Sequence, residues 1–196
     1  MVNTDKSLLE AHLKGNTTAF AELVRRYGDS LLGYLTRMTG SREQAEDLFQ
    51  ETFKRVHEKA DTFRGSRIKS WLFTIATNVA IDGSRRRSRL QVVSLNQGLD
   101  CADGKCEELG AVTVARNSCD PSQEVVRAEQ KEQVRQALEL LPTRQRATIV
   151  LAYYQQLSYA EVAKVMGCSI GTVKTQMYRA LRALAQRLPD ISENVI

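Results

Sequence analysis

Five polar side chains share one side of a predicted helix near the C-terminus: Lys174, Thr175, Tyr178, Arg179 and Arg182. Cations and hydroxyls of this kind contact phosphates, and with an aromatic ring they can also contact base edges in a major groove. The opposite side is apolar at three- and four-residue steps, and we expect it to be buried (Ile170, Val173, Met177, Leu181, Leu184 and Leu188). The helix is therefore a candidate reader of duplex DNA, with Gln176 on its flank as a secondary contact.

A shorter helix and a tight turn precede this reader. Ser158 and Glu161 have the spacing of a capping box, Gly167 can end the short helix, and Ser169 can cap the next one. Between Ser158 and Arg187, five cations oppose one acid, which gives a net charge of +4. These features predict a helix-turn-helix that binds DNA. The alternative is an ordinary helical hairpin with a charged, solvated face.

A second basic surface is predicted earlier in the chain. One side of the helix around Trp71 to Arg86 is polar and carries Asn78, Asp82, Arg85 and Arg86. Arg64 lies in the loop before this helix. From Arg64 to Arg89, seven cations oppose Asp82 alone, a net charge of +6. A solvated helix end would have the same pattern. Trp71 falls on the apolar stripe, so we expect it in the core rather than stacked on a base.

The helix that follows Ser41 is acidic on its outer face. Ser41 and Gln44 are spaced as a second capping box, and the outward positions include Asp47, Gln50 and Glu51. Across residues 41–63, six acids oppose four cations. This surface is unsuited to DNA.

The overall pattern predicts an all-α protein with two helical domains. The chain of 196 residues is 42% hydrophobic and has a formal net charge of +5. Apolar residues recur at helical spacing over 5–14 and 20–38, which predicts a helix in each range, with an irregularity in the second helix at Gly28. No segment has the alternating pattern of a strand. We expect a first domain at 1–87, a flexible linker at 88–120, where three glycines and acidic residues interrupt the helical period, and a four-helix domain at 121–196.

Several classes of function have no support in the sequence. No apolar run is long enough to span a bilayer, and the N-terminus has no signal-peptide pattern, so we expect a cytoplasmic protein without membrane insertion. His12 and His57 are far apart in the sequence, no catalytic constellation is visible, and we expect no cofactor and no metal. Cys101, Cys106 and Cys119 are expected to be incidental thiols, although zinc binding and redox sensing are alternatives.

The order of these segments resembles bacterial RNA polymerase sigma factors of the extracytoplasmic-function (group IV) type. The phrases that carry the resemblance are AFAELVRRYGDSLLGYL, REQAEDLFQETFKRVHEKADTF, SWLFTIATNVAIDGSRRR and LPTRQRATIVLAYYQQLSYAEVAKVMGCSIGTVKTQMYRAL. They cover nearly everything outside the linker. In this family, regions two and four form two helical domains.

The resemblance implies a role for each surface. Asp47, Gln50 and Glu51 match the motif that docks on the clamp helices of the largest polymerase subunit. The 61–67 loop and the helix from Trp71 to Arg86 would bind and melt the −10 element, and the reader helix would bind the −35 element. The flap of the second-largest subunit would be a further contact. Basic surfaces that are exposed in the free protein favour a mechanism that keeps the protein inactive until it is needed. An anti-sigma factor is therefore a candidate partner.

These implications favour a sigma factor that binds core polymerase, recognises promoter DNA through two elements and promotes melting, and that is not itself an enzyme. The alternative is a two-domain helix-turn-helix regulator whose N-terminal helices bind a ligand or dimerise. Such a regulator has no use for an acidic docking helix followed by an arginine-rich one. A third alternative, a phosphodiesterase or other small helical enzyme, would need clustered His and Asp ligands, which this sequence lacks.

Overall fold

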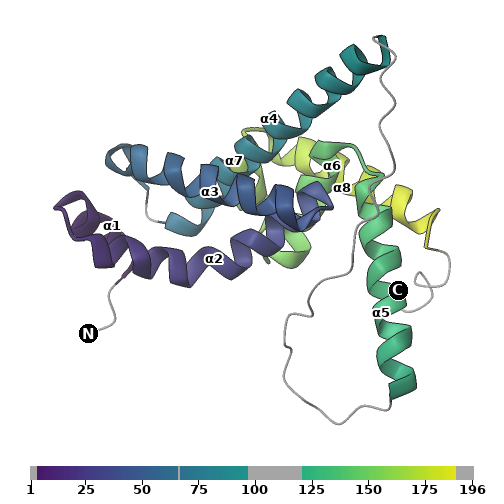
Figure 1. Ribbon diagram of the computed structural model, residues 1–196, viewed down its shortest axis with the longest axis horizontal. Helices are drawn as coiled ribbons and strands as arrows, with labels where there is room; N and C mark the ends of the chain where they lie inside the picture. Colours follow the sequence, from purple (N-terminus) through teal and green to yellow (C-terminus); the bar gives the residue numbers. More distant parts are fainter. Residues whose placement is uncertain (1–3, 66, 97–120, 189–196) are drawn as a thin grey trace.

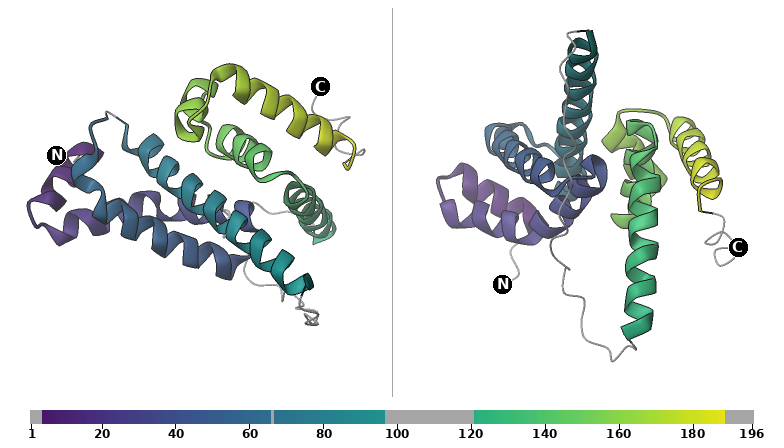
Figure 2. Two further views of the ribbon diagram at one scale, coloured as in Figure 1. Left: turned by 90° about the horizontal axis from the view of Figure 1, so that it is seen from above. Right: turned by 45° about the vertical axis from the view of Figure 1, so that its right-hand side comes forward.

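The computed structural model describes residues 4–65, 67–96 and 121–188, and all regular structure in these ranges is helical. The elements in chain order are α1 (Asp5–Leu13), α2 (Thr17–Thr39), α3 (Arg42–Glu58), the 3-10 turn η1 (Ala60–Thr62), α4 (Ile68–Asn96), α5 (Pro121–Glu139), α6 (Thr143–Ile149), the π-helical turn η2 (Val150–Tyr154), α7 (Tyr159–Met166) and α8 (Ile170–Ala185). The prediction of an all-α fold is confirmed. The helices α1–α4 form one group and α5–α8 form a second group packed beside it (Figures 1 and 2).

Local side-chain contacts set both ends of α2. The side-chain oxygen Oδ1 of Asn16 accepts hydrogen bonds from the backbone amides of Thr18 and Ala19 at 3.0 and 3.3 Å, so the helix begins before the predicted Phe20. Gly40, with φ of +76°, ends it. The disturbance predicted at Gly28 is wrong, because α2 is continuous there. Burial on both sides of the glycine outweighs a helix penalty of about 1 kcal/mol.

Helix α3 has only half of the predicted capping box. The Ser41 hydroxyl accepts a hydrogen bond from the Gln44 amide at 3.4 Å, but the Ser41 amide donates to the Thr39 hydroxyl at 3.3 Å. Thr39 therefore takes the place predicted for the Gln44 side chain. The inner face is as expected, with Phe53 and Val56 buried against the core.

Helix α4 is longer than the sequence predicts. It begins at Ile68, runs past the expected domain end at residue 87 and continues to Asn96. No Gly or Pro interrupts the chain between Gly83 and Gly98. The flexible segment predicted to begin at Ser88 is therefore helical as far as Asn96, and its remainder, 97–120, lies outside the described residues.

The buried stripe of α8 differs from the prediction. Val173, Met177 and Ala180 are buried, whereas Ile170 and Leu181 are 47% and 41% exposed. At about 100° per residue, Ile170 and Leu181 fall on the flank of the stripe that starts at Val173. The prediction that they are buried is wrong, since α6 and α7 cover a narrower face than the apolar pattern suggests.

Candidate nucleic-acid interface

Helix α8 presents the predicted reader residues to solvent. Lys174, Thr175, Tyr178, Arg179 and Arg182 are all exposed, and the Tyr178 side chain stands out with 65% of its residue surface accessible. Gln176 is half-buried at the flank, as its position predicts. The exposed Ile170 and Leu181 extend this face with apolar area that could contact thymine methyl groups.

The turn before α8 is fixed by hydrogen bonds and backbone conformation. The Ser158 amide and hydroxyl donate to the Glu161 carboxylate at 3.0 and 2.7 Å, and the Ser158 hydroxyl accepts from the Glu161 amide, which completes the predicted capping box. These bonds, with a smaller effect of Arg67, lower the pKa of Glu161 to about 2. Gly167 has φ of +60° and Ser169 caps α8. The reader helix is thus held at a set angle to α7.

The polar face of α4 forms a second exposed surface. Asn78, Asp82, Arg85 and Arg86 are all exposed along it. Arg85 lies 3.9 Å from Asp82, but an ion pair this exposed contributes little to stability. Both arginines can therefore reach a phosphate at little cost.

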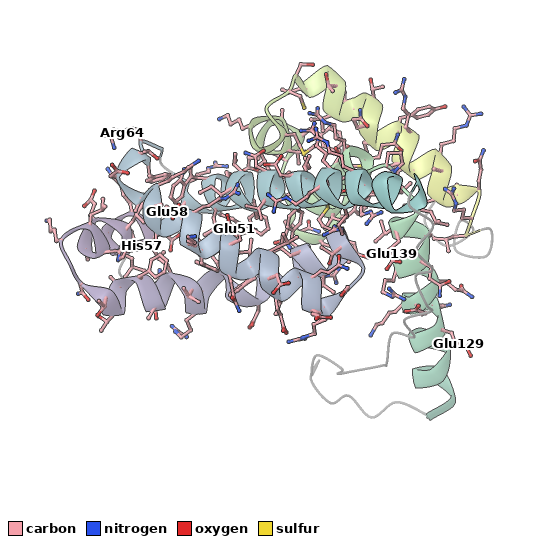
Figure 3. All side chains as sticks on the ribbon, turned by 45° about the horizontal axis from the view of Figure 1, so that its top comes forward. Glu51, His57, Glu58, Arg64, Glu129 and Glu139 are labelled. Atoms are coloured by element: carbon pink, nitrogen blue, oxygen red, sulfur yellow. The ribbon has the colours of Figure 1, made fainter. Side chains whose placement is uncertain are left out.

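The loop before α4 directs its first arginine inward to its own backbone. The Arg64 guanidinium donates to the carbonyls of Asp61 and Phe63, and Figure 3 shows this residue at the tip of the loop. The rings of Phe63 and Trp71 lie 5.2 Å apart, and Trp71 is half-buried against both apolar clusters. This packing agrees with the prediction that Trp71 is a core residue.

The outer face of α3 carries the predicted acidic surface. Asp47 and Gln50 are exposed, and Glu51 is half-buried with its carboxylate 2.7 Å from Arg55 (Figure 3 labels Glu51). This surface is on a different helix from the two basic surfaces. The acidic surface and the two basic surfaces therefore lie on three separate helices, α3, α4 and α8.

The structure brings together two histidines that are 45 positions apart in the sequence. His12 Nε2 lies 3.0 Å from His57 Nδ1, and the His12 ring packs 4.6 Å from the ring of Phe20. Burial and the charge of His57 lower the pKa of His12. The pair joins α1 to the end of α3, and no periodicity in the sequence signals it.

Other features predicted from the sequence are only partly within the described residues. Cys101, Cys106 and Cys119 lie outside them, and Cys168 is half-buried in the turn before α8. In the part of the chain that the structure describes, no cluster of three or more His, Cys, Asp or Glu could hold a metal ion. Across the same residues no helix is long and apolar enough to cross a bilayer.

Comparison with known proteins matches both helix groups. Residues 23–90 match the family described as Sigma-70 region 2, and residues 131–184 match Sigma-70, region 4. The chain is 33% identical over 180 residues to the ECF RNA polymerase sigma factor SigW of Bacillus subtilis, covering 91% of this chain and 93% of that protein. It is 30% identical over 189 residues to the ECF RNA polymerase sigma-E factor of Haemophilus influenzae, covering 96% and 97%. The solved structure of the sigma factor RpoE in complex with the anti-sigma factor NepR from Bartonella quintana is similar at a TM-score of 0.63, with 28% identity, covering 87% of this chain and 97% of that one.

Proposed function

Because the chain belongs to the extracytoplasmic-function family of RNA polymerase sigma factors, we propose that it directs core RNA polymerase to promoters through −10 and −35 elements and promotes melting. The observation that carries the proposal is the presence of two exposed basic surfaces, on α4 and α8, beside an acidic surface on α3. A DNA-binding regulator that worked without polymerase would need only one of these three surfaces.

The two basic surfaces suit different forms of DNA. The face of α8 has hydroxyls, an aromatic ring and cations on a projecting helix, which matches duplex read in the major groove at −35. The face of α4 pairs arginines with the amide of Asn78. Arginines can track the phosphates of a separated strand, while an amide can hydrogen-bond an unpaired base, so we assign this face and the 61–67 loop to the −10 element.

We assign the acidic surface to the polymerase itself. Asp47, Gln50 and Glu51 are the proposed contacts to the clamp helices of the largest subunit, and the second helix group would also contact the flap of the second-largest subunit. Complementary charge at such a surface speeds association and fixes orientation. On this basis the chain acts as a regulator of initiation rather than as an enzyme. The predicted domains are 1–87 and 121–196, and because α4 continues to Asn96 the first domain would extend to that residue.

We further propose that a separate protein restrains this sigma factor. The similar RpoE structure contains the anti-sigma factor NepR, and the basic faces of α4 and α8 are open to solvent here. A partner that covered either face would block promoter binding.

The decisive experiment adds the purified protein to sigma-free core polymerase and genomic DNA, then maps the transcripts that start at defined positions. We expect specific start sites with a shared −10 and −35 pattern. Templates with either element scrambled are the controls. A protein that binds DNA but yields no specific transcript with core polymerase would support the helix-turn-helix regulator instead.

A further inference from the structure

Helix α1 lies before the range 23–90 that matches Sigma-70 region 2, and none of the three proposed contact surfaces includes it. Its buried residues are Leu8 and Leu9, whereas Leu13, the last residue of the helix, is 52% exposed. What α1 does for the molecule therefore depends on what the two buried leucines pack against.

The two leucines belong to an apolar cluster that is separate from the larger core. Its buried members come from α1, α2, η1 and α4 (Leu8, Leu9, Ala19, Leu23, Ala60 and Ile68). Ala60 begins η1 and Ile68 begins α4, so the cluster includes a residue on each side of the proposed −10 loop at 61–67. Helix α1 also contacts η1 directly. The leucines of α1 are therefore part of the surface on which both ends of this loop are packed.

The aromatic residues at the loop pack on the same cluster. Phe63 and Trp71 are both half-buried against it, with their ring centroids 5.2 Å apart. The Phe63 amide donates to the Ala60 carbonyl oxygen at 3.4 Å. A Cβ added at Gly65 would lie 3.1 Å from the Phe63 ring, so the backbone passes close to that ring. The position of Phe63, and of the backbone beside it, is thus set by the surface that α1 helps to form.

Polar contacts fix α1 at both of its ends. In the first turn, the Asp5 carboxylate accepts hydrogen bonds from the Tyr27 hydroxyl and, at 3.0 Å, from Arg26 Nη1, both on α2. In the last turn, His12 Nε2 lies 3.0 Å from Nδ1 of His57, near the end of α3 and shortly before η1. Figure 1 shows α1 against α2 at the end of the first helix group. Helix α1 cannot move along α2 without breaking these contacts.

We propose that α1 is a positioning element of the −10 site, in which Leu8 and Leu9 set the conformation of the loop that reads an unpaired base. The inference rests on the proposed function, which assigns the 61–67 loop to the −10 element. A recognition site has to be held within about 0.5 Å of its working geometry by the residues that support it. The apolar cluster gives the loop this support. Leu8 and Leu9 act through the loop and do not themselves contact DNA.

Leu8→Ala and Leu9→Ala, made separately, test the packing in the free protein, because each leaves a cavity in the cluster. Backbone hydrogen exchange, measured by mass spectrometry, should become faster over 60–71 and stay parental over 170–185 in α8. Leu13→Ala is the matched control, since it shortens an exposed leucine of the same helix, and it should change neither range. Leu8→Met and Leu9→Met keep the side-chain volume and should keep the parental exchange.

The same variants, assembled with core polymerase, test the reading of the −10 element. The probes are two fluorescent single strands, one with the −10 sequence shared by the mapped start sites and one with that sequence scrambled. The ratio of the two affinities should fall at least about fivefold in the alanine variants, which is the smallest loss expected when one base is no longer read. The ratio should stay parental in Leu13→Ala. Affinity for core and for −35 duplex should not change, whereas a general loss of folded protein would lower all of these affinities together.

Parental exchange over 60–71 in the alanine variants would overturn the positioning role, and so would a parental affinity ratio in variants whose exchange is faster. Leu8→Val and Leu9→Val replace any alanine variant that loses its helical circular-dichroism signal, and the same changes are expected in the same direction. A parent protein that yields no specific start sites, or that does not distinguish the two strands, would count against the proposed function. The exchange measurement needs no polymerase, so it still decides whether α1 holds the loop.

Discussion

The hydroxyl of Tyr34 lies 2.8 Å from the hydroxyl of Thr77, and this hydrogen bond joins α2 to α4 inside the core. Tyr34 is completely buried, and burial raises the pKa of its phenol. Its ring also meets the ring of Phe73 edge to face at 5.4 Å. The contact fixes how the proposed −10 helix lies on the first helix group.

Tyr34→Phe should lower the free energy of unfolding by about 1–3 kcal/mol, because it leaves the buried Thr77 hydroxyl without this partner. Urea denaturation followed by circular dichroism measures the change. Tyr153→Phe is the matched control, since Tyr153 is 54% exposed and should tolerate the loss of its hydroxyl. Equal stability of both variants would mean that the Thr77 hydroxyl finds another hydrogen-bond partner when the Tyr34 hydroxyl is removed.

Reversing charge at Asp47 and Glu51 to Lys should abolish co-purification with core polymerase and leave helix content unchanged, because both residues lie off the buried face of α3. Affinity capture on tagged core measures binding, and circular dichroism monitors the fold. Glu10→Lys with Glu129→Lys is a control with the same change in net charge on other helices, and it should bind. If the helical circular-dichroism signal and core binding were lost together, these carboxylates would be needed for folding rather than for docking.

Alanine at Lys174 or Arg179 should weaken binding to a −35 duplex by about 1–3 kcal/mol if the side chain contacts a base. If the side chain contacts only a phosphate, its loss would weaken binding to every sequence alike. It would also reduce the slope of log K against log salt concentration by about one unit. Fluorescence anisotropy of holoenzyme on cognate and scrambled duplexes separates the two cases. Lys6→Ala, which removes a lysine from α1, is the control. Parental affinity in both variants would remove α8 from the reading role.

Arg85→Ala with Arg86→Ala should impair opening of the −10 region while core binding and −35 contacts persist, because the exposed face of α4 loses two phosphate-binding groups. Permanganate reactivity of −10 thymines in the promoter complex measures opening. A pre-melted bubble should rescue most of the loss, since the cost of unpairing has been supplied in the template. Normal opening of linear duplex by the double variant would leave this face as a solvated helix end.

The His12–His57 contact should make stability depend on pH. The pKa of His12 is lowered in the fold, so the unfolded state binds its proton more tightly, and stability present above a pH of about 6.5 is lost as the pH falls through the lowered value. Thermal unfolding between about pH 7.5 and 5.5 should show this decline in the parent and a smaller one in His12→Gln. The low pKa of Glu161, about 2, keeps that carboxylate charged throughout this range. An identical decline in both proteins would assign it to other groups.

Features set by neighbouring residues could be predicted from the sequence. The Ser158–Glu161 capping box, the left-handed Gly167 and the cap at Ser169 depend on side chains within a few positions, and the structure has all three. The exposure of the polar faces of α4 and α8 follows from helical periodicity in the same way. The assignment of those faces to particular contacts with DNA and polymerase stays a prediction.

Features set by distant residues could not. Buried Leu23 and Leu31 keep α2 continuous through Gly28, and the width of the α6 and α7 contact decides that Ile170 and Leu181 remain exposed. His12 meets His57 across 45 positions, Arg67 meets Glu161 across 94 and Arg146 meets Met38 across 108. Periodicity gives the face of a helix that is buried but not the partner that covers it, so only the tertiary structure decides the junction between the two helix groups.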